Sequence, residues 1–428
     1  MTPRMLKQTL EEWSREVHVP ADLAERALRR RSRLRLTRFA GAVSCAALVA
    51  AVALLVPLVV APRFAPQVDT GGAPVVVPVQ PYRVQPYRVQ PYRASSPARD
   101  VLADTENSPP KKMIAAGRVA VSAYFTWRRR AVAGREVMDR TWYLLDPVTE
   151  SYEKTEWGWA EVAPGLRWAA VLEKDLPARR IGIFDMEKRQ VRAWVSVDHP
   201  VGGVSWSPDG TRLVATAYDD HPDLSRDSVH YGRRCPARVA ATPEDPRQPR
   251  FQTVSTSRTG FYVVDVATAT AGDFHAVDPC WTDNSNVRRD FAWSGDGTLI
   301  RERSLSRWHD AFLDLAGRPH DAPPGHVATE SKAGVSPDGT LLAGRDGMPT
   351  KVTEVSTGKV VGRQQVLQLL AWADDRRLVA LGCAGTCDNE FRNGLVLVSV
   401  DGRQTVPLTA DRKHSQKPEA WEPILTLR

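Results

Sequence analysis

A strand–turn–strand pattern recurs after residue 112 and constrains the fold more than any other feature of the chain. Its fullest copy, 204–215, reads Val-Ser-Trp-Ser-Pro-Asp-Gly-Thr-Arg-Leu-Val-Ala. Proline followed by Asp-Gly supplies a tight turn, and the flanking residues alternate between apolar and polar, as in half-buried strands. Four more copies lie at 160–170, 291–300, 334–343 and 370–380. The candidate turn residues are Pro208, Asp209, Gly210, Asp296, Gly297, Pro337, Asp338 and Gly339.

A second strand–turn–strand unit alternates with the first. Its leading strand is carried by 142–147, 181–185, 261–265, 312–317, 352–356 and 395–401. Together the two units give four short strands with a period of about 40 residues, which is typical of the blades of a β-propeller. The pattern predicts an all-β fold over 113–428, a propeller of six blades. Seven blades is the alternative, because the third repeat is oversized.

The turn motif resembles the Ser-Pro-Asp-Gly repeat of TolB-like and WD-repeat-like propellers. The resemblance is carried by 207–210, 294–297 and 336–339, and it extends over 113–428. The Gly-His and Trp-Asp dipeptides of classical WD repeats are not regularly present. The resemblance implies a propeller fold and leaves function open, because one fold hosts many activities.

The ends of the repeat array predict how the ring closes. Residues 117–123 read as the second strand of the first blade, so its innermost strand is missing. The segment 419–427 is apolar enough to supply that strand and close the ring. We expect the recurring tryptophans to pack blade cores rather than to stack on a ligand. They are Trp206, Trp293 and Trp372.

The position of the Asp-Gly turns defines two ends of the predicted ring. They join the first and second strands of each blade, at an end that we call the turn face; the opposite end is the loop face. An oversized loop, about 218–253, belongs to the loop face. It contains the candidate binding loop residues Asp219, Asp220, His221, Asp223 and Asp227. Closely spaced oxygens can hold calcium, but the run lacks the glycine and glutamate of a regular calcium loop, which favours a solvated acidic loop.

Four cysteines, all expected on the loop face, are candidates for disulfides: Cys235, Cys280, Cys383 and Cys387. An even number on one side of the membrane segment described below suits an oxidising compartment. Cys235 and Cys280 are placed to bridge neighbouring blades, and Cys383 and Cys387 to close a small loop. A zinc site at the latter pair is disfavoured because a second close pair of ligands is missing.

The segment 39–61 is a run of 23 residues without charge. About 20 apolar residues in a helix cross a bilayer core, and the run is longer than the apolar core of a cleaved signal peptide. Seven arginines lie between residues 26 and 38, and short basic flanks stay in the cytoplasm. The sequence therefore predicts a single-pass protein of the cell membrane, with its N-terminus inside and 113–428 outside the cytoplasm.

The segments on either side of 39–61 differ in character. In 1–38, apolar residues at three- and four-residue spacing predict a helix, which either lies on the membrane surface or docks on a cytoplasmic partner such as a sigma factor. The segment 62–112 is rich in proline and repeats Val-Gln-Pro-Tyr-Arg at 79–83, 84–88 and 89–93. Proline at every fifth position prevents helix and strand ladders, so we expect an extended spacer.

These features favour a binding or scaffold module that meets a protein or cell-envelope ligand. We find no nucleophile elbow, phosphate loop or paired carboxylates, and expect no enzyme, no cofactor and no metal. The net charge of +8 is concentrated before the membrane segment, so no nucleic-acid partner is expected. The alternatives are a transmembrane regulator acting through 1–38, and an extracellular lyase or glycosidase.

Overall fold

The computed structural model describes residues 89–93, 100–224, 254–255, 257–278, 280–281, 288–303, 310–383, 391–414, 417–418 and 420–428. They belong to the second of the two units into which the chain divides, Pro81–Arg428. The predicted cytoplasmic segment 1–38 and membrane segment 39–61 lie outside them. Among the residues that are described, no helix is long and apolar enough to cross a membrane. The described residues therefore do not support the transmembrane helix that the sequence predicts.

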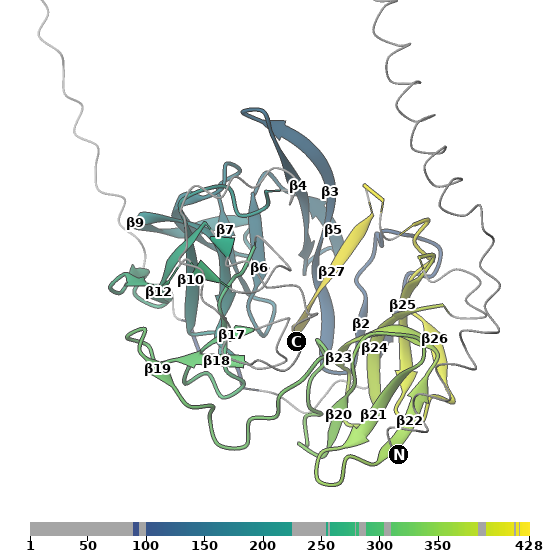
Figure 1. Cartoon of the computed structure of the whole chain (residues 1–428). Helices are drawn as coiled ribbons and strands as arrows, with labels where there is room; N and C mark the ends of the chain where they lie inside the picture. Colours follow the sequence, from purple (N-terminus) through teal and green to yellow (C-terminus); the bar gives the residue numbers. More distant parts are fainter. Residues whose placement is uncertain are drawn as a thin grey trace, which may run out of the picture. The chain divides into compact units, whose positions relative to one another are not determined.

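The described residues form an all-β domain whose sheets succeed one another around a centre, in a propeller-like arrangement (Figure 1). The first sheet contains β1 (Val101–Leu102), β2 (Ala115–Ala116), β3 (Val119–Val132), β4 (Arg135–Asp146), β5 (Ser151–Lys154) and β27 (Trp421–Leu427). β27 pairs antiparallel with β3, from Trp421 opposite Thr126 to Leu427 opposite Val119. The end of the chain therefore joins the first repeat, as predicted. β1 lies within the predicted linker and pairs with β2.

The second sheet has eight strands. They are β6 (Trp159–Val162), β7 (Trp168–Leu172), β8 (Ala178–Asp185), β9 (Gln190–Trp206), β10 (Arg212–Tyr218), β12 (Arg258–Asp265), β13 (Thr270–Ala271) and β14 (His275–Ala276). β9 pairs mainly through its first half with β8 and through its second half with β10. A separate short sheet joins β11 (Val254–Ser255) and β15 (Cys280–Trp281).

Three further antiparallel sheets complete the described fold. One contains β16 (Ala292–Trp293), β17 (Ile300–Arg303), β18 (Asp310–Leu313) and β19 (Pro319–His320). The next contains β20 (Leu341–Ala343), β21 (Thr350–Glu354) and β22 (Val360–Gln364). The last contains β23 (Val366–Trp372), β24 (Arg377–Gly382), β25 (Gly394–Ser399) and β26 (Thr405–Pro407).

The number of complete blades differs from the six predicted. Among the described residues, four sheets have four or more strands. One reason is that β9 runs without a break, so that two predicted blades share one sheet. Another is that Val335 meets Leu342 only through an isolated bridge, which leaves the sheet of β20 to β22 with three strands.

The predicted turns share one pattern of hydrogen bonds. The Ser207 hydroxyl donates to Asp209 Oδ1 (2.5 Å) and accepts from the backbone N–H of Arg212 (3.0 Å). Equivalent bonds link Ser294 to Asp296 and Leu299, and Ser336 to Asp338 and Leu341. The glycine after each aspartate has a φ of 67° to 77°, a conformation that favours glycine. Pro208 and Pro337 lie between the serine and the aspartate of their turns.

Removing one of these serines tests the turn. Ser207→Ala deletes both hydroxyl hydrogen bonds at a buried position. We expect the free energy of unfolding to fall by about 1–2 kcal/mol, measured by urea denaturation. Ser196→Ala, at an exposed position of β9, is the control and should change it by less than about 0.5 kcal/mol. Equal losses in the two variants would contradict the role given to the Ser207 hydroxyl.

The recurring tryptophans bind each repeat to the one before it. The Nε1 atom of Trp206 donates to the backbone carbonyl of Glu161 (2.9 Å). Trp293 donates in the same way to Ser205 (3.1 Å) and Trp372 to Gly334 (3.2 Å). All three indoles are buried, so the predicted packing role is confirmed.

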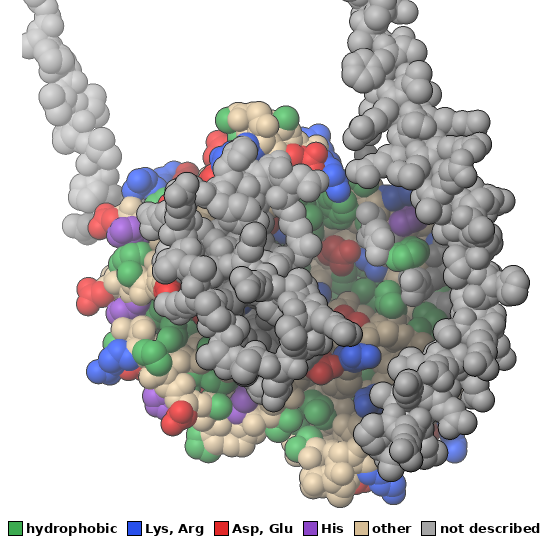
Figure 2. Space-filling view, viewed as in Figure 1, with side chains coloured by type: hydrophobic (Ala, Val, Ile, Leu, Met, Phe, Trp, Pro, Cys, Tyr) green, Lys and Arg blue, Asp and Glu red, His purple; other side chains and the backbone are tan. Residues whose placement is uncertain are grey.

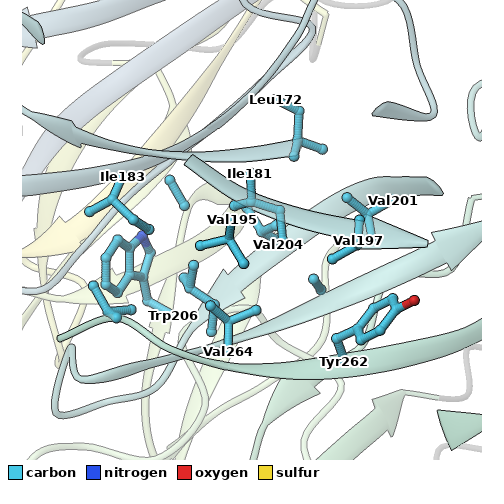
Figure 3. Close-up of a cluster of buried hydrophobic side chains, with 14 of the residues drawn as sticks. Leu172, Ile181, Ile183, Val195, Val197, Val201, Val204, Trp206, Tyr262 and Val264 are labelled. Carbon is cyan, nitrogen blue, oxygen red and sulfur yellow. The ribbon is translucent and has the colours of Figure 1, made fainter. Parts of the chain in front are cut away.

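The largest core cluster lies where β9 belongs to two hairpins. Figure 3 shows side chains of this cluster from β7, β8, β9 and β12, and β10 adds Leu213 and Ala215. Val195 and Val204 come from the two halves of β9, and both pack in this cluster with Trp206. Burying one aliphatic side chain contributes about 1.5–3 kcal/mol, so shared packing of this kind fixes neighbouring repeats against each other.

Candidate binding site

The loop after β10, which holds the predicted binding residues, is fixed to the hairpin of β3 and β4. The backbone N–H of Met138 donates to the carbonyl of Asp223 (2.9 Å), and Val137 forms a bridge with Leu224. Arg135 holds Asp220 with both Nη atoms, one of them at 2.8 Å. Asp219 precedes this contact, and Asp227 lies outside the described residues.

Asp223 is buried between two arginines instead of being solvated. Its side chain is 4% exposed and forms ion pairs with Arg140 and with Arg288 Nη1 (2.7 Å). Burial alone would raise the pKa of Asp223, but the two guanidinium groups outweigh burial and lower it. The Nδ1 atom of His221 accepts from the backbone N–H of Asp223 (3.1 Å), and burial lowers the pKa of this imidazole.

Arg288 connects groups from several strands. Its Nε atom donates to Asp290 Oδ2 (2.6 Å), and Nη2 donates to the carbonyl of Gly202 on β9. Its guanidinium lies 3.8 Å from the centroid of the Trp159 ring on β6, in the range of a cation–π contact. Arg140 lies 5.7 Å from the same ring. Two arginines thus share one indole, and Asp223 neutralises part of their charge.

Asp290 accepts a hydrogen bond from a buried tyrosine. The Tyr218 hydroxyl donates to Asp290 Oδ1 (2.9 Å) and accepts from the backbone N–H of Arg289 (2.9 Å). Burial, reinforced by Asp290, raises the pKa of Tyr218 well above its usual value. A Cβ at position 203 would lie 2.4 Å from Asp290 Oδ1, so Gly203 leaves the space that the carboxylate occupies.

Glu161 lies on β6, the strand that also carries Trp159, and is the last member of this group of interacting side chains. Its Oε1 accepts from the Ser205 hydroxyl (3.2 Å) and from the backbone N–H of Trp206 (3.3 Å). Burial raises the pKa of Glu161 to about 7, although both hydrogen bonds oppose the rise; the charge of Asp290 adds to it, and Arg288 opposes it. A carboxyl group of this kind changes its charge near neutral pH.

The raised pKa of Glu161 predicts a pH-dependent stability. The unfolded chain ionises a glutamate near pH 4.3, whereas the folded chain holds this proton up to about pH 7. Stability should therefore fall as pH rises through this window. In urea denaturation, the free energy of unfolding of Glu161→Gln minus that of wild type should increase by roughly 1–3 kcal/mol between pH 5 and pH 8.

The matched control is Glu153→Gln, because the Glu153 side chain is 51% exposed and pairs with Arg189 on the surface. The difference in free energy of unfolding between Glu153→Gln and wild type should stay nearly constant over the same pH range. A constant difference for Glu161→Gln as well would contradict a raised pKa in the folded protein.

We name these seven residues the central cluster: Arg140, Trp159, Glu161, Tyr218, Asp223, Arg288 and Asp290. Of them, only Asp223 was a predicted site residue. Glu161 had a usable signal, since it is a carboxylate at an interior position of a predicted strand. Within the described ranges, no group of three or more His, Cys, Asp or Glu is arranged to hold a metal ion. The cluster offers paired charges and one carboxyl that titrates near neutrality.

Basic side chains stand next to the loop on the hairpin of β3 and β4. The side chains of Arg128, Arg129 and Arg130 are 68%, 62% and 41% exposed. Elsewhere, Figure 2 shows acidic, basic and hydrophobic side chains interspersed on the described part of the visible surface. Each of these arginines pairs with Asp139 or Glu136 of the same hairpin, so the hairpin presents exposed arginines beside carboxylates at the edge of the loop face.

The four cysteines are only partly described. Cys383 follows β24, is buried and is disulfide-bonded. The backbone of Cys280 lies in β15, opposite Ser255. Cys235 and Cys387 lie outside the described residues, so the predicted pairing stays a prediction.

Comparison with known proteins gives no family assignment. No family matches the sequence, and no curated protein matches it. Solved structures that resemble the chain include TolB from Acinetobacter baumannii, at 14% identity and a TM-score of 0.34, over 68% of this chain and 64% of that chain. The hydrazine synthase of Kuenenia stuttgartiensis has 12% identity and a TM-score of 0.30, over 56% of this chain and 62% of that chain.

A chain of the Mitotic Checkpoint Complex has 13% identity and a TM-score of 0.33, over 83% of this chain and 90% of that chain. This chain thus spans less than two thirds of TolB and of the hydrazine synthase chain. Because these identities and scores are low, the propeller-like fold rests on the strand pairing and turns described above.

Proposed function

We propose that this protein is a non-catalytic binding or scaffold module, held outside the cytoplasmic membrane, whose loop face binds a protein or cell-envelope ligand. The observation that supports this most is the central cluster, where buried charges tie the loop after β10 to strands of other repeats. A surface that is ordered before binding loses less conformational entropy when a ligand arrives. The exposed arginines of the β3–β4 hairpin would then be the first to meet that ligand.

The test is a photo-crosslinker placed at Arg129 in the full chain, expressed in cells. We expect a defined crosslinked adduct with one partner. The yield of this adduct should fall at least about tenfold in a variant that carries the probe together with Arg128→Gln and Arg130→Gln, because complementary charge steers the encounter of two binding surfaces. The control variant carries Arg318→Gln and Arg403→Gln, whose side chains are 79% and 85% exposed in turns. An adduct that the control variant reduces equally, or that forms only from a probe on the turn face, would contradict the proposal.

The membrane location has its own test. The uncharged segment 39–61 and the arginines before it support an anchor with its N-terminus inside. The protein should resist extraction by alkaline carbonate, and a protease added outside should digest only 62–428. Deleting 1–25 should leave ligand binding unchanged; a change in transcription would instead favour the regulator.

We also propose that the ring holds six repeats. β9 would give its first half to one repeat and its second half to the next, because it pairs with β8 and then with β10. Val335 would mark the innermost strand of the repeat that contains β20 to β22. A crystal structure with five or seven repeats would overturn this count.

A second candidate function, a lyase or glycosidase of the propeller type, is favoured by one observation. Glu161 has a pKa of about 7, raised by burial and also by the charge of Asp290. General acid–base catalysis favours groups that titrate near the working pH. If this candidate holds, Glu161→Gln should abolish turnover of a polysaccharide panel. Absence of turnover by the wild-type protein on that panel would count against it.

A further inference from the structure

The third copy of the repeated pentapeptide, 89–93, contacts the turn face of the propeller. The backbone N–H of Tyr92 donates to the carbonyl of Asp209 (2.7 Å), within the turn between β9 and β10. The Tyr92 hydroxyl donates to the backbone oxygen of Arg428 (3.3 Å). Val89 packs against the large core cluster. A segment expected to be a free spacer is therefore bound at this point.

The spacing of the two contacting residues fits an extended polyproline-like chain. Such a helix has three residues per turn, so Val89 and Tyr92 lie on the same side. Both are half-buried, whereas Gln90, Pro91 and Arg93 are exposed. The pentapeptide thus has a binding side made of valine and tyrosine and a solvent side made of the other three residues.

The receiving surface is shaped to admit the tyrosine ring. A Cβ at position 165 would lie 3.3 Å from Tyr92 Cδ2, and Gly165 has a φ of +84°. The N–H of Gly165 donates to the carbonyl of Leu427 at the end of β27 (2.8 Å). The surface is therefore built from the turns of two hairpins and the strand that joins the first sheet, and it exists only when β27 is in place.

We propose that this surface is a binding site for the peptide Val-Gln-Pro-Tyr-Arg, and that the three copies in the linker are alternative ligands for it. Their sequences are identical, so each carries the same valine and tyrosine. The surface receives one tyrosine, in its contacts with Asp209 and Arg428, so one copy binds at a time. Moving to the preceding copy shortens the linker before the docked peptide by about 15 Å.

Limited trypsin digestion of the purified full chain tests the site, because Arg83, Arg88 and Arg93 end the three copies. We expect cleavage after Arg93 to be at least about tenfold slower than after Arg83, since protection tracks the fraction of docked chain. The peptide acetyl-Val-Gln-Pro-Tyr-amide in excess should remove this protection, and acetyl-Tyr-Gln-Pro-Val-amide should not. Equal cleavage of the three bonds in the wild-type chain would overturn the site.

Variants in the linker test the exchange of copies. Tyr92→Ala should expose Arg93 and slow the cleavage after Arg83, because the copy at 84–88 then occupies the site and Arg83 precedes it as Arg88 precedes Val89 in the wild-type chain. Tyr87→Ala is the matched control and should keep the wild-type pattern. If Tyr92→Ala exposes Arg93 while the bond after Arg83 is cleaved as fast as in the wild-type chain, the copies are not alternative ligands and that part of the proposal fails.

Discussion

Replacing Arg288 by methionine is expected to lower the free energy of unfolding by about 3–5 kcal/mol, the range for breaking a buried ion pair by removing one partner. The Arg288 side chain is 12% exposed and pairs with Asp223 and Asp290. Methionine keeps much of the side-chain length but none of the charge. Among the described residues, Asp223 would keep Arg140 as its arginine partner, and the Oδ2 atom of Asp290 would lose its bond from Arg288.

The expected loss of stability is large because removing Arg288 leaves Asp223 and Asp290 with fewer cationic partners in the protein interior. Asp223 is 4% exposed, so water cannot replace the guanidinium. The lowered pKa of Asp223 means that its contribution to stability is present above the usual carboxyl pKa and is lost as pH falls through the lowered value. The difference in free energy of unfolding between wild type and variant should therefore narrow below the usual carboxyl pKa of about 3.9, as measured by urea denaturation at pH 7 and at about pH 2.5.

An exposed ion pair provides the control. Arg318 pairs with Asp314 at 2.7 Å, but its side chain is 79% exposed, and surface pairs are worth about 0–1 kcal/mol. Arg318→Met should therefore change stability very little. If Arg288→Met costs less than about 1 kcal/mol at pH 7, the central cluster is not the element that holds the loop after β10.

The parts of the fold that could be predicted from sequence are those set by neighbouring residues. The turn at Ser207 needs only Asp209, Gly210 and a backbone N–H two residues later, so its signal is contained in six consecutive residues. The joining of 419–427 to the first repeat was also predictable, because the first repeat lacked one strand. The blade count was not, because β9 continues through Pro200, Gly202 and Gly203, residues that usually interrupt a strand, so that two predicted blades share one sheet.

The central cluster could not be predicted because its members are far apart in the chain. Asp223 was singled out with its acidic neighbours, but its partners Arg140 and Arg288 lie 83 and 65 residues away. Nothing local distinguishes these two arginines from the many others in the sequence. An acidic run without its partners looks solvated, and the structure shows that long-range pairing can bury it.

The docking of 89–93 was missed for a related reason. Proline at every fifth residue indicates an extended chain, and this local inference says nothing about what the chain contacts. The receiving groups, Asp209 and Arg428, belong to a turn and to the end of the sequence.

Deleting 420–428 is expected to abolish cooperative folding, a larger effect than that of any single substitution proposed above. β27 pairs along β3 over seven residues. Trp421 is 2% exposed and packs in a core cluster with Leu425 and Leu427. At about 1.5–3 kcal/mol for each large apolar side chain, the loss approaches the whole stability of a domain, roughly 5–15 kcal/mol.

The deletion also uncovers a strand edge. β3 would lose its partner along Val119 to Thr126, and an unpaired apolar edge promotes aggregation. The truncated chain should be insoluble or show no unfolding transition in circular dichroism. A synthetic peptide of residues 419–428 added during refolding should restore the transition, because it supplies the same strand in trans. Trp421→Ala is the intermediate case, with an expected loss of about 3–5 kcal/mol. If the truncated chain melts at the temperature of the full chain, β27 is not the strand that holds the ends of the array together.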